Sequence, residues 1–152
     1  MKQGPRLDMI QENMKPGAYT AHGFLGEDNR MLKDILREDN SAVERHGISH
    51  EEIAEKMRHF TEIGRRFPES TVTDGDFEIT VDDHRGFIPC PFADNEKSLK
   101  TNTKLLNKKT GKTVYWSDLS IHMIMNHGFY EGKGSFFRTE PVELAKILGL
   151  IE

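Results

Sequence analysis

The richest concentration of potential ligand-binding groups lies between residues 128 and 138, where the chain reads GFYEGKGSFFR. Gly132 and Gly134 allow the backbone to approach a ligand closely, because glycine has no Cβ. Lys133 and Arg138 add two cations, and arginine has a planar fork that suits a carboxylate or a phosphate. We therefore predict a site for a small anionic ligand. The predicted ligand-binding residues are Asn126, Tyr130, Lys133, Ser135 and Arg138.

This stretch does not match a nucleotide-binding P-loop. That motif, Gly-x4-Gly-Lys-Ser/Thr, follows a strand and precedes a helix. Here three residues separate Gly128 from Gly132, and Gly134 stands between Lys133 and Ser135. The composition therefore favours anion binding without the geometry of a P-loop nucleotidase.

Two histidines, His122 and His127, precede the loop on a predicted helix. Histidine can act as a general base near neutral pH, and Glu131 could orient it or act as an acid. His122, His127 and Glu131 are thus candidate catalytic residues of an alternative function, a small enzyme whose Lys/Arg loop stabilises an anion. No spacing ties these residues to one reaction, so a binding protein is the preferred interpretation.

A zinc site could be assembled from His84, Cys90, His122 and His127, which lie on a predicted hairpin and the helix that follows it. Structural zinc sites usually contain paired cysteines at short spacing, and this chain has one cysteine. His122 and His127 are also turned about 140° away from each other on an ideal helix. The sequence therefore predicts no bound metal and no other cofactor.

The charge distribution disfavours nucleic acid as a partner. The chain has a formal net charge of −4, whereas a nucleic-acid-binding domain normally has a clustered basic face. Lysines do gather between Lys97 and Lys112, but lysine also protects sheet edges against aggregation. The acidic helix predicted near residues 50–66 leaves open a third class, a helix-mediated protein-interaction module, and a homo-oligomer also stays open.

The sequence predicts a cytoplasmic protein with no membrane partner. The single cysteine, Cys90, suits a reducing compartment, and no apolar run approaches the roughly 20 residues that a transmembrane helix needs. The N-terminal residues lack the apolar region of a signal peptide.

The order of hydrophobic patterns predicts one α+β domain. Residues 1–27 form an irregular arm, and residues 28–152 form the domain, which is helical over 28–67, rich in β-structure over 71–116 and helical over 117–152. We expect an antiparallel sheet of two hairpins, at 77–92 and 103–116, packed with four to five helices. In the first hairpin we expect a turn at 82–86 and a returning edge strand, because Pro89 and Pro91 oppose central pairing.

Two serines mark expected helix starts. Ser49, followed by Glu52, matches a capping box. Ser117 can cap a helix that ends at His127, with Gly128 in the left-handed position beyond its end. This boundary would bring His127 to the start of the glycine-rich loop and so to the predicted site.

Overall fold

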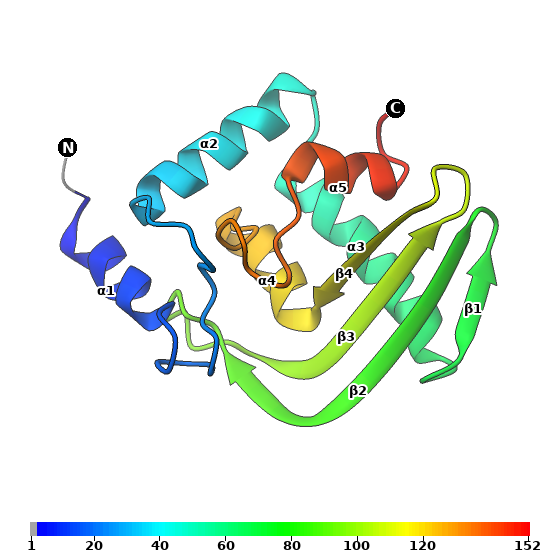
Figure 1. Cartoon of the computed structure of the whole chain (residues 1–152), viewed down its shortest axis with the longest axis horizontal. Helices are drawn as coiled ribbons and strands as arrows, with labels where there is room; N and C mark the ends of the chain where they lie inside the picture. The colour runs from blue at the N-terminus through cyan, green and yellow to red at the C-terminus, as the bar shows by residue number, and fades with distance from the viewer. Residues whose placement is uncertain (1–2) are drawn as a thin grey trace.

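The computed structural model describes residues 3–152, and over these residues it confirms the predicted α+β class (Figure 1). The elements in chain order are α1 (Pro5–Asn13), α2 (Leu32–Arg45), α3 (His50–Arg65), β1 (Thr71–Asp74), β2 (Phe77–Pro89), β3 (Lys97–Asn107), β4 (Lys112–Ser117), α4 (Asp118–His127) and α5 (Pro141–Ile147). The strands form one antiparallel sheet in the order β1-β2-β3-β4.

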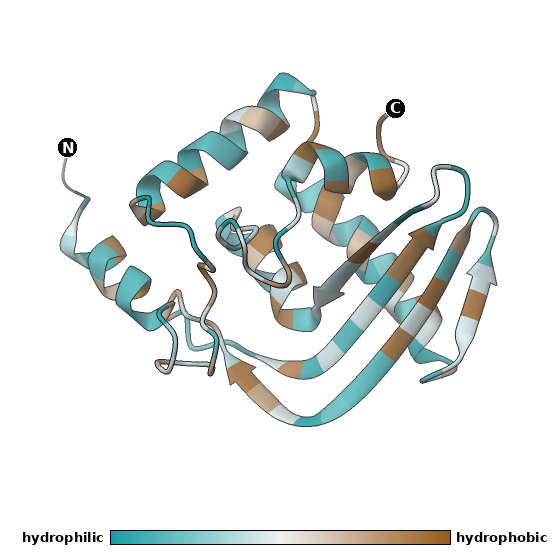
Figure 2. Cartoon of the chain, viewed as in Figure 1, coloured by the Kyte–Doolittle hydropathy of each residue, from teal (hydrophilic) through white to brown (hydrophobic). Residues whose placement is uncertain are grey.

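One face of the sheet packs against helices, and the other faces solvent. Period-two alternation produces this arrangement, because successive side chains of a strand point to opposite faces. Ile79 of β2 pairs with Leu105 of β3, which pairs with Val114 of β4, and all three are buried. Figure 2 shows the alternation as brown and teal bands along β2 and β3.

Helix α3 begins as predicted, since the Ser49 side chain accepts a hydrogen bond from the Glu52 amide. It lies so close to the sheet that a Cβ on Gly64 would come within 2.6 Å of the Val81 side chain. A buried polar contact joins the same layers, because Trp116 Nε1 donates to Thr61 Oγ1 at 2.8 Å. These contacts fix α3 across β2 and β4.

The first hairpin differs from the expectation. The predicted turn at 82–86 is wrong, because β2 continues through these residues to Pro89 and pairs with β3. Gly86, at φ 100°, lies in a β-bulge between His84 and Phe87, so the glycine bends the strand instead of reversing it. The reversal occurs at residues 90–96. The predicted returning edge strand is also absent, since β2 lies between β1 and β3.

The N-terminal arm, predicted to be irregular, contains helix α1. Pro5 lies at the first turn, where proline is tolerated because its missing N–H would be unpaired in any case. Ile10 is the buried residue of this helix. One buried position is too little to give a recognisable apolar stripe in the sequence, which is why the pattern escaped detection.

The buried side chains form two clusters on either side of α4. The larger one lies between the sheet, α3 and α5, and receives Ile121 and Ile124 from α4. The smaller one joins α1, α2 and the arm to Leu119 and Met123 of α4, and it also includes Cys90. Helix α4 is thus buried on two faces. Within residues 3–152, no helix has the length and apolar character that crossing a membrane requires.

Candidate functional site

Arg138, predicted to bind an anionic ligand, is engaged by acidic groups of the chain itself. Its side chain is 6% exposed and forms a two-pronged ion pair with Asp39 of α2, with N···O distances of 2.6 and 3.0 Å. It also donates to the Glu131 carbonyl and to the Glu140 carboxylate. These bonds use all five N–H groups of the guanidinium. In this structure Arg138 therefore fastens the loop to α2.

The glycines of the loop allow it to dock against the N-terminal arm. The Gly132 amide donates to the Phe24 carbonyl, and the Glu27 amide donates to the Lys133 carbonyl, both at 2.9 Å. A Cβ on Gly132 would lie 2.2 Å from the Leu25 carbonyl oxygen, and a Cβ on Gly26 would lie 2.3 Å from a backbone nitrogen of the loop. We call this contact between residues 24–27 and 131–135 the glycine seam.

The other predicted ligand-binding residues do not converge on one site. Tyr130 is buried, and its hydroxyl lies 2.8 Å from His50 Nδ1. Asn126 is exposed near the end of α4, where its amide contacts the Nδ1 atom and the carbonyl of His122. Ser135 donates to Glu131 at 2.5 Å. Lys133 is exposed beside the seam, and its backbone amide donates to the Asp28 carboxylate.

Glu131 has the most unusual environment of the candidate catalytic residues. It is 4% exposed and has a left-handed backbone, with φ 67°. Burial raises the pKa of its carboxyl group to about 7, against the opposing effects of the Ser135 hydrogen bond and the Arg138 charge. A non-glycine residue at positive φ is uncommon and is found disproportionately at functional sites.

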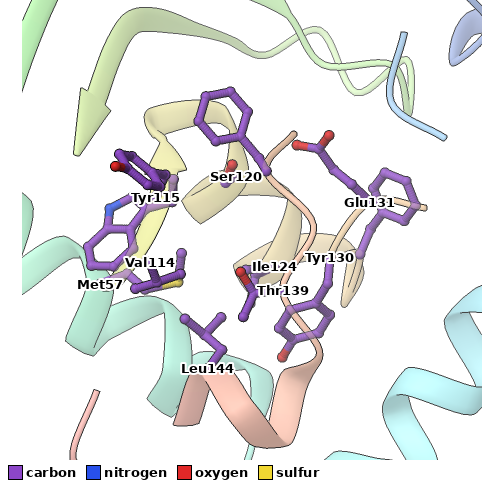
Figure 3. A pocket seen from close by; sticks show the side chains of 12 residues that line it. Met57, Val114, Tyr115, Ser120, Ile124, Tyr130, Glu131, Thr139 and Leu144 are labelled. Carbon is purple, nitrogen blue, oxygen red and sulfur yellow. The ribbon is translucent and has the colours of Figure 1, made fainter. Parts of the chain in front are cut away.

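A small cavity lies behind this residue. Figure 3 shows Tyr130 and Glu131 on the loop after α4, across the cavity from Val114 and Tyr115 of β4. Its volume of about 10 Å³ is at the lower limit for one water molecule, and most of its lining is apolar. It is therefore a packing gap and no ligand site.

A much larger cleft, of about 1030 Å³, opens in front of Glu131. Four segments form its walls: the arm at 19–26, the bent part of the β2–β3 hairpin, the junction of β4 and α4, and the loop at 131–137. Of the residues predicted to form sites, Glu131, Ser135 and His84 line this cleft. We call it the aromatic cleft, because Tyr19, Phe87 and Phe136 stand exposed along its walls.

A second cluster of polar side chains lies where the β2–β3 turn meets α4. His122 Nε2 and His127 Nε2 each lie 2.7 Å from the same oxygen of Asp94, Oδ2. Cys90 completes the group, so that one potential ligand atom from each of four side chains lies within 4.8 Å of the other three. We call Cys90, Asp94, His122 and His127 the four-ligand cluster. It brings together three of the four residues named for a zinc site, whereas His84 lies on the aromatic cleft.

The two histidines meet although they are not on one helix face. His122 lies in the middle of α4 and His127 at its C-terminal end, and their rings, with centroids 5.6 Å apart, reach toward the turn at 90–96. The predicted boundary holds, with Gly128 in the left-handed conformation after His127. His127 also stacks on Phe92 of the turn at 4.0 Å between centroids, which fixes the ring orientation.

Charge and burial oppose each other in the four-ligand cluster. Burial acts to raise the pKa of the Asp94 carboxyl, but hydrogen bonds from His127, the Glu96 amide, His122 and Cys90 outweigh it, so the pKa is well below its usual range. Burial raises the pKa of the Cys90 thiol to about 12. Without an added cation, Asp94 is therefore ionised and Cys90 is a neutral thiol at neutral pH.

Sequence reasoning missed Asp94, although its spacing contains a signal. Cys90 and Asp94 are separated by three residues, and His122 and His127 by four. Zinc sites commonly combine a C-x2–4-C pair with an H-x3–5-H pair. Reading aspartate in the place of the second cysteine would have identified all four positions.

A comparison of the chain with family models, curated proteins and solved structures finds no match.

Proposed function

We propose that this protein binds a small organic anion with an aromatic or other apolar part in the aromatic cleft. The observation that carries the proposal is the composition of the cleft wall. Tyr19, Phe87 and Phe136 line it with exposed fractions of 36%, 53% and 75%. Large exposed apolar side chains around one concavity are typical of ligand-binding sites.

The polar groups of the cleft favour a negative ligand. Lys100 is a cation on the lining. Among the described lining residues the one acid is Glu131, whose raised pKa leaves it partly protonated near pH 7. The electrostatic balance therefore attracts an anion, and the protonated Glu131 carboxyl could donate a hydrogen bond to it.

The aromatic rings would hold the apolar part of the ligand. Phe136 lies with its ring centroid 4.8 Å from that of Phe137 in an edge-to-face contact, so the pair offers an apolar wall. Phe87 already has a cation above it, because Lys97 Nζ lies 4.7 Å from its ring centroid. An aromatic carboxylate or phosphate would satisfy both kinds of contact.

The test is an amide chemical-shift titration with benzoate, phenyl phosphate and the neutral analogue benzyl alcohol. We expect shifts at residues 84–88, 100–102 and 134–137, with the two anions binding more tightly than the alcohol. Lys100→Ala should weaken anion binding about 2- to 5-fold, as loss of an exposed ion pair predicts. Phe136→Ala should weaken all three about 2- to 10-fold through lost ring contact.

Matched controls separate a cleft effect from a general one. Lys108→Ala removes a lysine from the β3–β4 turn, and Phe67→Ala removes a ring that is 61% exposed elsewhere, so neither should change affinity. Equal affinity for benzyl alcohol and benzoate would refute the anionic part of the proposal. Shifts confined to the outer face of the lysine-rich hairpin would refute the cleft and favour nucleic acid.

Glu131 supports a second candidate, an enzyme of the aromatic cleft. A buried carboxyl group with a pKa of about 7 suits general acid or base catalysis at neutral pH. His122 and His127 do not line this cleft, so in this hypothesis Glu131 replaces histidine as the proton-transfer group. Incubation with aryl esters and aryl phosphates tests the enzyme hypothesis. The hypothesis requires that the wild type hydrolyses one of them, that Glu131→Gln abolishes this turnover and that Lys108→Ala preserves it.

A further inference from the structure

We propose that Cys90, Asp94, His122 and His127 bind one Zn²⁺ ion in a closed tetrahedral site with a structural role. This inference does not depend on the proposed function, because none of the four residues lines the aromatic cleft. The sequence predicted no bound metal, and the experiment below decides between that prediction and this proposal.

The donor set is the first argument. A thiolate, two imidazoles and one carboxylate form a mixed sulfur, nitrogen and oxygen set that suits zinc, whereas Mg²⁺ and Ca²⁺ prefer oxygen ligands alone. Four protein ligands leave no open position for water or substrate, which is the pattern of structural zinc sites. The bound ion would keep Cys90 as a thiolate, since a coordinating thiol is deprotonated.

The distances are the second argument. Zn–N and Zn–S bonds of about 2.0 to 2.3 Å place tetrahedral ligand atoms roughly 3.3 to 3.8 Å apart. The four potential ligand atoms here all lie within 4.8 Å of one another, and the two histidine nitrogens lie 2.7 Å from Asp94 Oδ2. Shifts of about 1 Å in side-chain positions would therefore complete the geometry without moving a strand or helix.

The arrangement of the two histidines around Asp94 is the third argument. Both histidine Nε2 atoms point at the same oxygen of Asp94, so the two imidazoles and the carboxylate converge on one point. A metal ion among them would let each Nε2 present its lone pair and let the carboxylate neutralise part of the ionic charge. Phe92 and Phe129, which are buried beside the cluster, would limit the access of water.

The residues around the cluster fit the outer sphere of such a site. Metal-bound histidines usually hydrogen-bond through their second nitrogen, which fixes the ring. Asn126 lies 3.1 Å from Nδ1 of His122. With Nε2 on zinc, Nδ1 carries the proton, so the Asn126 carboxamide would turn its oxygen toward Nδ1 and give up the hydrogen bond that its NH2 group donates to the His122 carbonyl. Phe92 fixes the His127 ring by stacking.

The position of the cluster explains the structural role. It joins the β2–β3 turn to the second half of α4, and Cys90 and Phe92 belong to the smaller hydrophobic cluster with α1 and α2. A bound ion would cross-link two segments that are distant in sequence and so stabilise this smaller cluster. Ion binding to the folded chain would raise the unfolding temperature in proportion to the logarithm of free zinc.

The experiment uses the full chain, stripped with a chelator and titrated with Zn²⁺ and Co²⁺. We expect one equivalent of zinc, a rise in the unfolding temperature with zinc, and intense tetrahedral cobalt bands with a sulfur-to-cobalt band in the near ultraviolet. Cys90→Ser should abolish the sulfur band. Asp94→Asn, His122→Gln and His127→Gln should each weaken zinc binding by at least about 100-fold, more than an outer-sphere change would.

His84→Gln is the matched control, because it removes an imidazole that lies on the cleft and should leave zinc affinity unchanged. Asn126→Leu should weaken binding about 10-fold, as expected for an outer-sphere group. If the ligand variants fail to fold, the wild-type data decide alone. An unfolding temperature that zinc does not change, or cobalt bound without a sulfur band, would overturn the proposal.

Discussion

Glu131→Gln should change how the stability of this protein depends on pH. The folded-state pKa of Glu131 is raised from the ordinary 4.5 to about 7, because burial disfavours the charged form. Between these pH values the folded chain holds a proton that the unfolded chain releases. The contribution of the protonated Glu131 carboxyl group to the free energy of unfolding is therefore fully present below pH 4.5. It is lost as the pH rises through about 7.

The size of the effect follows from the shift. Each pKa unit corresponds to about 1.4 kcal/mol, so a shift from 4.5 to about 7 amounts to roughly 3 kcal/mol. Glutamine keeps the shape of the protonated acid but does not ionise. We expect Glu131→Gln to match the wild type within about 1 kcal/mol near pH 4.5 and to be more stable by up to about 3 kcal/mol at pH 8.5.

Urea unfolding at several pH values between 4.5 and 8.5 measures this difference. Trp116 is the single tryptophan and is 1% exposed, so its fluorescence reports unfolding of the core. Burial lowers the pKa of His50, but the difference between variant and wild type removes the contribution of that group. Exposed Glu62→Gln is the control. If the free energy of unfolding changes with pH in the same way for the wild type and for Glu131→Gln, the reasoning is refuted.

Three further substitutions test the packing described above, each by urea unfolding at constant pH. Thr61→Val leaves the buried Trp116 N–H without its acceptor and should cost about 1 to 3 kcal/mol; an unchanged midpoint would show that the bond contributes nothing. Arg138→Met leaves the buried Asp39 carboxylate without its ion-pair partner and should lower the free energy of unfolding by about 3 to 5 kcal/mol. Adding Asp39→Asn to that variant should partly restore it. Gly64→Ala forces a methyl group against β2 and should cost about 1 to 3 kcal/mol; an unchanged midpoint would show that the Val81 side chain moves aside without cost.

Local signals in the sequence were sufficient for most of the fold. The caps at Ser49 and Ser117 and the hairpin at 103–116 depend on residues close together in the chain, and the structure has all three. The first hairpin was misjudged because Gly86 suits both a turn and a bulge, and only pairing with β3 decides between them. Helix α1 was missed because its packing partners come from other parts of the chain.

The candidate site was harder to predict, because partners distant in sequence decide what each side chain does. Arg138 looks like a free anion-binding group until Asp39, 99 residues away, is placed beside it. The backbone amide of Lys133 likewise donates to the carboxylate of Asp28, which is 105 residues away. Asp94 was overlooked because a lone aspartate is common in turns, although its spacing from Cys90 resembles that of a zinc-ligand pair.

The glycine seam also has a consequence for how this sequence can vary. Gly26 and Gly132 lie opposite the backbone of the other segment, so a side chain at either one pushes the arm away from the loop. Once one substitution has opened the seam, the second meets little further resistance, and the two energetic penalties should be far from additive. The arm and the loop, more than 100 positions apart in the chain, are therefore constrained to change together.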